Sequence, residues 1–278
     1  MNTKTILASL GLFLLGACQY NGTDFPTPAP GSVVIADRIS NQRVNAFTED
    51  RNGHIWMATQ RGLNRYDGAE FQQFFSTDDA HGLPDNQISD VHALPDGRIW
   101  ATTRLGAVVS TLEGDFHRVK AETPDSNLGQ ILETRSGKFL FSNGNSLLAY
   151  IPEEDLLRPV IRELNAFGAQ ALALDREDRL WVISAGGFRL NCYNTEDFSL
   201  QSSTPISFQA YHLCDAQDGT LWLTGMGQLG ILKADDLRWQ PIPAPLLAQK
   251  KVTGGDIDLM FAPGGDEMLL NVIDEVWK

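Results

Sequence analysis

The sequence has few cysteines, few basic residues and no apolar run long enough to cross a membrane. Its 278 residues include three cysteines, too few for a disulfide framework. Two of them, Cys192 and Cys214, fall in strand-like segments, where they form either one bridge or two small buried thiols. Lys and Arg number 22 against 35 Asp and Glu, so the formal net charge is −13. A surface this acidic repels phosphate groups, and we therefore expect neither a nucleic-acid partner nor direct adsorption to anionic lipid.

A short apolar segment, residues 6–15, follows Lys4 near the amino terminus. About 20 apolar residues are needed to cross a bilayer core of roughly 30 Å, so this segment indicates an export signal and not a membrane helix. It ends in Leu-Gly-Ala-Cys at residues 15–18, which resembles the lipobox of bacterial lipoproteins. The resemblance implies a signal peptide over residues 1–17 and a lipid on Cys18. Gln19, which is not aspartate, implies an outer-membrane lipoprotein that faces the periplasm or the cell surface. An ordinary cleaved signal is the alternative.

Residues 18–32 contain spaced prolines and glycines and little apolar content. Such a composition keeps a chain extended and does not support a packed core. We therefore expect a tether that reaches at most about 45 Å. The folded domain is expected to span residues 33–278, held at the membrane only through the lipid anchor.

Four of the six tryptophans recur at regular intervals along this domain: Trp56, Trp100, Trp181 and Trp222. The intervals are 44, 81 and 41 residues, and the position skipped in the middle interval is occupied by Leu140. A period near 41 residues is typical of a β-propeller blade, because four short strands bury their faces only when neighbouring blades stack against them.

Each repeat is also marked by a turn residue three positions before the tryptophan site. These residues are Gly53, Gly97, Gly137, Asp178, Gly219 and Gly265. Apolar residues six positions before and two to three positions after each turn predict two antiparallel strands joined by a tight hairpin. Two further β-prone segments follow in most repeats. The sequence therefore predicts an all-β fold, a propeller of about six four-stranded blades.

The sixth repeat supplies three strands before the sequence ends at Lys278. Residues 33–35, Val-Val-Ile, form a spare β-prone run just before the first blade. We predict that this run pairs as the outer strand of the last blade and closes the ring without a bare edge. The alternative is that the chain is the first part of a longer propeller.

The segment Asp-Arg-Asn-Gly-His-Ile-Trp at residues 50–56, followed by Gly-Leu-Asn-Arg-Tyr at residues 62–66 and Phe71, resembles the two-component regulator propeller repeat. The resemblance extends, with decreasing fidelity, over about residues 33–278. It implies a periplasmic sensor-type ring. Sensors of that family have many more blades and continue through a membrane helix into a kinase, so we expect a recognition ring and not a kinase.

Ligands of propellers bind where the loops between second and third strands converge with the links between blades. The candidate ligand-binding residues in these loops are Gln60, Arg61, Arg104, Asn143, Asn145 and Met226. Arg61 and Arg104 occupy similar places in adjacent blades, where they either hold a carboxylate or sulfate together or are solvated loop residues.

The sequence indicates no catalytic residue, metal site or cofactor motif. The repeated aspartates lie at hairpin turns, and the histidines lack the spacing of metal ligands. We therefore expect a monomeric, non-catalytic recognition or sensor-type propeller that binds a small molecule, a saccharide or a protein partner. The alternative is a propeller-fold polysaccharide lyase or glycoside hydrolase. A glycoside hydrolase needs two carboxylates about 5 to 10 Å apart.

Overall fold

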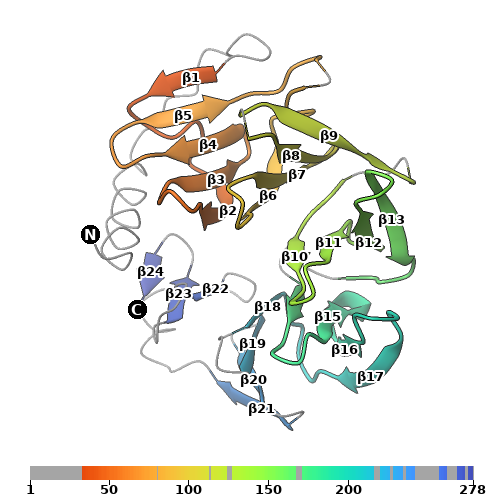
Figure 1. Cartoon of the computed structure of the whole chain (residues 1–278). Helices are drawn as coiled ribbons and strands as arrows, with labels where there is room; N and C mark the ends of the chain where they lie inside the picture. The colour runs from red at the N-terminus through yellow and green to blue at the C-terminus, as the bar shows by residue number, and fades with distance from the viewer. Residues whose placement is uncertain are drawn as a thin grey trace.

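The computed structural model describes residues 33–79, 81–112, 114–123, 127–166, 171–215, 220–225, 228–233, 236–241, 257–261, 268–272 and 275–277. These residues form short strands in successive sheets around a common centre (Figure 1), so the prediction of an all-β propeller is confirmed. The expected signal peptide, lipidated Cys18, tether and Met226 lie outside them. In the described part of the chain, no helix is long and apolar enough to cross a membrane.

The strands follow one another in six groups, which we call blades 1 to 6. Blade 1 contains β2 (Val44–Glu49), β3 (Ile55–Thr59), β4 (Gly62–Tyr66) and β5 (Phe71–Phe74). Blade 2 contains β6 (Ile88–Ala93), β7 (Ile99–Thr103), β8 (Gly106–Ser110) and β9 (Phe116–Ala121). Blade 3 contains β10 (Ile131–Glu133), β11 (Phe139–Ser142), β12 (Leu147–Ile151) and β13 (Leu156–Ile161).

The remaining groups continue the same meander. Blade 4 contains β14 (Leu172–Leu174), β15 (Leu180–Ser184), the short 3-10 helix η2 (Ala185–Gly187), β16 (Arg189–Tyr193) and β17 (Leu200–Pro205). Blade 5 contains β18 (His212–Asp215), β19 (Thr220–Gly225), β20 (Gln228–Lys233) and β21 (Asp236–Pro241). Blade 6 contains β22 (Ile257–Phe261), β23 (Met268–Val272) and β24 (Glu275–Trp277). Because three strands are described in blade 6, the completeness of the ring stays a prediction.

Repeated tryptophans pack between blades in blades 1 and 4. Trp56, which is 6% exposed, lies in a cluster with Ile88 and Val91 of blade 2. Trp181, which is 3% exposed, lies in a cluster with Leu213 of blade 5. Burial of Trp56 and Trp181 against the neighbouring blade is therefore an apolar contribution to the stability of the ring.

An aspartate before the turn orients two of these tryptophans. The indole Nε1 of Trp56 donates a hydrogen bond to Asp50 Oδ2 at 2.9 Å, and Trp181 Nε1 donates to Asp175 Oδ2 at 2.7 Å. Burial alone would raise the pKa of Asp50, but hydrogen bonds from Trp56 and from the backbone of Asn52 and His54 hold it below its ordinary value. The aspartate therefore fixes the hairpin and the tryptophan together.

The predicted partner of the amino-terminal strand is wrong. Strand β1 (Val33–Ala36) pairs antiparallel with β5 of blade 1, with Val33 opposite Phe74 and Ala36 opposite Phe71. The order of the sheet is β1-β5-β4-β3-β2. Residues 37–43 reach at most about 24 Å, enough to span four strand spacings of about 4.8 Å. The nearest open edge is thus the outer edge of blade 1, and β1 adds a fifth strand there.

A second edge pairing joins blades 2 and 3. Outer strands β9 and β13 are parallel neighbours, with Leu156 opposite Lys120 and Leu157 opposite Ala121. The backbone N–H of Glu122 extends this pairing to Leu157 O at 2.9 Å. Blades 2 and 3 consequently form one eight-stranded sheet.

We call the side that carries the hairpins between first and second strands the turn face, and the opposite side the loop face. The loop face carries the turns between second and third strands and the links between blades. The boundary between two adjacent blades is called a seam. Within the described residues, Cys192 in β16 and Cys214 in β18 are not joined by a disulfide.

Candidate functional site

The seam between blades 3 and 4 opens on the loop face into a cleft of about 620 Å³. This volume lies within the range of small-molecule sites. The cleft is lined by Gly144, Asn145, Glu163, Leu164, Asn165, Ala166, Ser184, Ala185, Gly186, Arg189 and Asn191. Most of these residues present amide, hydroxyl or charged groups, so the cleft suits a polar ligand.

The blade 3 wall is a loop held in shape by its own backbone. Asn143 Oδ1 accepts hydrogen bonds from the backbone N–H of Asn145 at 3.2 Å and of Ser146 at 2.6 Å. The segment that leaves β13 is attached to this turn, because Leu164 N donates to Asn145 O at 2.7 Å and Ala166 N donates to Gly144 O at 2.8 Å. Glu163 and Asn165 are thereby held at the rim as exposed side chains.

The blade 4 wall begins with the turn between β15 and β16, where η2 lies. Ala185, Gly186 and Gly187 all have positive φ, at 52°, 67° and 92°. A Cβ at Gly187 would lie 2.6 Å from Ala210 O, so only glycine fits there. An isolated antiparallel bridge between Ala166 and Ser184 joins the two walls at their base.

A chain of hydrogen bonds runs along the blade 4 wall. Arg189 Nε donates to Ser203 Oγ at 3.0 Å, and Ser203 Oγ donates to Asn191 Oδ1 at 2.6 Å. Asn191 Nδ2 in turn donates to Ser184 Oγ at 2.9 Å. Ser184 lines the cleft and is 3% exposed, and its hydroxyl accepts the hydrogen bond that ends this chain. These bonds fix the direction of the polar groups before any ligand arrives.

Two charged side chains stand at opposite walls of the cleft. Glu163 belongs to the blade 3 wall and Arg189 to the blade 4 wall, and both are exposed. Among the residues that the structure describes, neither makes an ion pair. The cleft therefore offers one acidic and one basic group.

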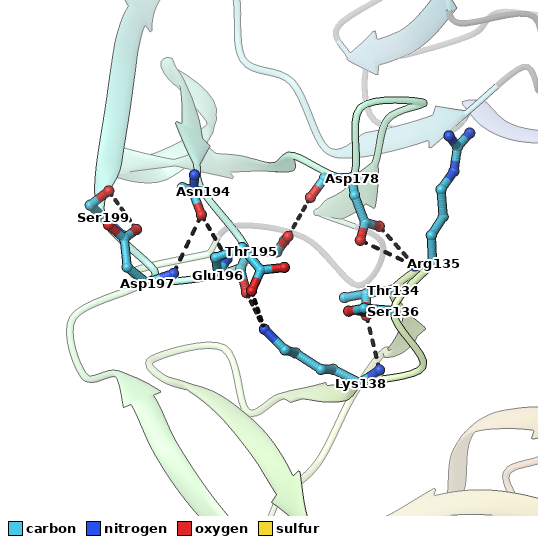
Figure 2. Close-up of polar contacts among 10 residues, drawn as sticks. All are labelled: Thr134, Arg135, Ser136, Lys138, Asp178, Asn194, Thr195, Glu196, Asp197 and Ser199. Carbon is cyan, nitrogen blue, oxygen red and sulfur yellow. Dashed lines mark hydrogen bonds and ion pairs between the residues drawn. The ribbon is translucent and has the colours of Figure 1, made fainter.

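The turn face of the same seam is different (Figure 2). Lys138 Nζ lies 3.0 Å from Glu196 Oε2 and donates to Thr195 O at 3.3 Å. The carboxylate of Asp178 accepts from the backbone N–H of Arg135 at 3.0 and 3.2 Å, and Thr195 Oγ1 donates to Asp178 O at 2.6 Å. In Figure 2 the Arg135 guanidinium points away from these contacts. Here the polar groups satisfy one another across the seam.

The seam between blades 2 and 3 contains a carboxylate with a raised pKa. Burial raises the pKa of Asp90 in β6 to about 6, against hydrogen bonds from the backbone N–H of Val91 and of Ile131, each at 2.8 Å. The same inner strands are joined by His92 Nε2 and Glu133 Oε2 at 2.9 Å. These groups join blade 2 to blade 3 and do not line the cleft.

The predicted ligand residues of blades 1 and 2 lie away from the cleft. Gln60 is exposed, and its backbone N–H donates to Arg43 O at 3.2 Å. The backbone N–H of Arg61 donates to Thr59 Oγ1 at 3.1 Å. Arg104 Nε contacts Asp85 Oδ2 at 3.0 Å, so an acidic residue of the chain already faces this guanidinium. A shared anion between Arg61 and Arg104 stays a prediction.

Of the two predicted residues in blade 3, Asn145 lines the cleft and Asn143 shapes the turn beneath it. Sequence reasoning missed Glu163, Asn165, Ser184, Arg189 and Asn191. One signal was present for Ser184 and Asn191, because these two residues and Ser203 are polar residues on adjacent strands of a blade that is otherwise apolar in its core. Glu163 and Asn165 lie in a link between blades that carries no repeat signature.

Comparison with family models matches residues 38–61 to the two-component regulator propeller, which confirms the resemblance predicted from the sequence. No curated protein matches the chain. Among solved structures, the chain is similar to the extracellular domain of the hybrid two-component system BT4673 from B. thetaiotaomicron, with a TM-score of 0.67 and 12% identity. The match covers 87% of this chain and 36% of that one, so this chain spans about a third of that sensor domain.

Two other similar structures are a lyase and a protein bound to a peptide. A streptogramin B lyase has a TM-score of 0.64 at 14% identity, with 86% of this chain and 80% of that chain covered. YCF48 bound to D1 peptide has a TM-score of 0.60 at 16% identity, with 83% and 74% covered. At such identities the likeness shows a shared propeller fold and no shared chemistry.

Proposed function

We propose that this chain, which carries a two-component regulator propeller repeat, is an exported recognition module that binds a small polar ligand without transforming it. The observation that carries the proposal is the loop-face cleft between blades 3 and 4. Its polar groups are held in place by hydrogen bonds within the chain, yet Glu163 and Arg189 have no ionic partner among the described residues. A site with fixed polar groups loses little entropy when a ligand binds.

The comparisons support this proposal in two ways. The sensor-type relative is an extracellular domain, which fits an exported protein. YCF48 is described as bound to a peptide, so a protein of similar fold accommodates a peptide ligand. Recognition by the loops of a rigid scaffold is also the usual arrangement in such folds.

An enzymatic role has less support from the cleft. Glu163 is the one carboxylate among the described residues that line it. Glycoside hydrolysis needs a pair of carboxylates at a set separation. In addition, the described part of the chain contains no group of three or more His, Cys, Asp or Glu side chains suited to a metal. The similarity in fold to a lyase therefore identifies no catalytic residue in this cleft.

A binding and turnover assay tests the proposal. The purified full-length protein is titrated calorimetrically with free amino acids, short peptides, neutral oligosaccharides and glycosaminoglycan fragments, and each mixture is then checked for products by mass spectrometry. We expect saturable binding of at least one class without product. Asn145→Trp should block the cleft, because this exposed side chain lines it. The matched Gln60→Trp in blade 1 should bind normally. Turnover, or equal binding by both variants, would contradict the proposal.

We further propose that the chain is a monomer anchored through a lipid on Cys18, in the outer membrane or at the cell surface. The lipobox-like end of residues 15–18 supports this anchor. Cys18→Ser should move the protein from the membrane fraction to a soluble or unprocessed form, and Gln19→Asp should change its sorting while it stays lipidated. Release of unmodified parent protein without lipid, measured by mass spectrometry, would contradict the anchor. Light scattering after detergent extraction checks the monomer.

A further inference from the structure

The two walls of the loop-face cleft carry opposite charges that do not meet. A Glu–Arg pair within about 4 Å would form an ion pair, as Arg158 and Glu154 do elsewhere in the described structure at 2.6 Å. Glu163 and Arg189 line one cleft, yet no ion pair of either is found in the part of the chain that the structure describes. The acidic and basic groups are therefore separated by the space of the cleft.

The guanidinium of Arg189 is held in position by one hydrogen bond through Nε. Ser203 holds Arg189 through Nε at 3.0 Å, and Ser203 is itself fixed by Asn191. The two terminal nitrogens of the guanidinium have no hydrogen-bond partner among the described residues. These nitrogens can bind the two oxygens of a carboxylate side by side, which is the strongest anion contact that arginine makes.

The acidic group is positioned by the loop beneath it. Leu164, the residue after Glu163, is 1% exposed and its N–H is bound to Asn145 O at 2.7 Å. The preceding residue, Arg162, is exposed and makes no ion pair with Glu163 in the described structure. Glu163 therefore keeps its carboxylate as an acceptor for a cation, of which a primary ammonium group is the simplest organic form.

The other described residues that line the cleft favour a ligand with peptide-like polar groups. Asn145, Asn165, Asn191 and Ser184 supply amide and hydroxyl groups. These match the peptide group as donors and acceptors. None of the described residues that line the cleft is aromatic, so these residues give a neutral sugar ring no flat apolar surface against which to pack.

We propose that the cleft binds a zwitterion of the size of a free amino acid or short peptide, with its ammonium group at Glu163 and its carboxylate at Arg189. This inference rests on the proposed function and specifies the ligand of the same site. The expected affinity is modest, because both charged groups are exposed and water screens them.

Calorimetry with blocked and unblocked peptides tests the assignment of each charge. The full-length protein is titrated with the twenty L-amino acids and with alanine di- to tetrapeptides, and each binder is compared with its N-acetyl and C-terminal amide derivatives. Glu163→Gln should weaken binding of the zwitterion about tenfold, and should leave binding of the N-acetyl derivative unchanged. Arg189→Gln should weaken the zwitterion similarly and leave the amide derivative unchanged.

Control variants and alternative ligands make the outcome decisive. Glu153→Gln and Arg135→Gln change exposed residues of the turn face and should bind like the parent protein. Unchanged melting temperatures show that the cleft variants fold. Binding of a neutral saccharide that Asn145→Trp abolishes, but that Glu163→Gln and Arg189→Gln leave unchanged, overturns the zwitterion and keeps the recognition function. Absence of binding by every amino acid and peptide overturns the inference as well.

Discussion

Both faces of the seam between blades 3 and 4 carry charged side chains, but the two sets differ in whether they contact the opposite blade in the described structure. On the turn face, Lys138, Asp178 and Glu196 contact groups of the opposite blade (Figure 2). On the loop face, Glu163 and Arg189 line a cleft and have no ionic partner in the described structure. Polar groups that meet across a seam hold two blades together, whereas charges that face an open cleft are available to a ligand. The predictions below test this distinction.

The largest effect is expected at the core of the seams. Trp181→Ala removes a 3% exposed side chain and leaves the Asp175 carboxylate without the indole donor at 2.7 Å. The free energy of unfolding should fall by about 3 to 5 kcal/mol. Phe188→Ala, at a 49% exposed residue of the loop face, should change it by less than about 0.5 kcal/mol. Urea unfolding measures both, and a small loss for Trp181→Ala would show that the tryptophan is not a core residue.

A smaller loss is expected at the turn face. Asp178 occupies a position that is glycine in the first three repeats, with φ at 63°, and its carboxylate accepts from Arg135 N. Asp178→Ala should cost about 1 to 3 kcal/mol, because it removes the inter-blade hydrogen bonds and replaces aspartate, which tolerates the left-handed conformation, with alanine, which tolerates it less well. Asp178→Gly removes the same bonds without that strain and should cost about 1 kcal/mol less. Equal losses for the two variants would show that backbone strain is unimportant there.

The third test concerns the pH dependence of stability at the seam between blades 2 and 3, where Asp90 lies. Its folded pKa of about 6 lies above the ordinary value of 3.8, so the folded state holds this proton more tightly than the unfolded state. The stability that Asp90 contributes is therefore complete below about pH 4 and is lost as pH rises through 6. Relative to Asp90→Asn, which cannot titrate, the parent protein should lose about 2 to 3 kcal/mol between pH 4 and 7. A difference that stays constant across these pH values would contradict the raised pKa.

The smallest effects separate the two faces most directly. Lys138→Gln removes an exposed ion pair and should cost less than about 1 kcal/mol, a loss that disappears in 1 M salt. Glu163→Gln removes no contact within the described chain and should leave stability unchanged at any salt concentration. Thermal unfolding at low and high salt compares the two. A salt-dependent loss for Glu163→Gln would show that this carboxylate has a partner in the folded protein.

The repeat made most of the fold predictable. The positive φ of Gly53, Gly97 and Gly137 agrees with the hairpins expected there, and Leu140, which fills the skipped tryptophan position, is completely buried. The start of strand β17 at Leu200 has no such signal, because it is set by Phe198, which has φ at 58° and ends the preceding turn. Side-chain periodicity gives strands and core, but it does not locate a turn that is set by backbone conformation.

Edge pairings were less predictable for a related reason. The pairing of β1 with β5 and of β9 with β13 is made by backbone groups, and any β-prone segment supplies those. Choosing among open edges requires distances in space, which the sequence does not contain. The candidate site was predicted only at Asn145, since the link that carries Glu163 and Asn165 has no period to mark it.

Hydrogen–deuterium exchange with and without ligand tests the central claim most directly. The protein is saturated with the tightest-binding free peptide of the panel, and exchange of backbone amides is followed by mass spectrometry. We expect slower exchange over residues 163–166 and 184–191, the two walls of the cleft, and no change over residues 134–138 and 194–199 of the turn face. Protection confined to the turn face, or equal on both faces, would contradict the account.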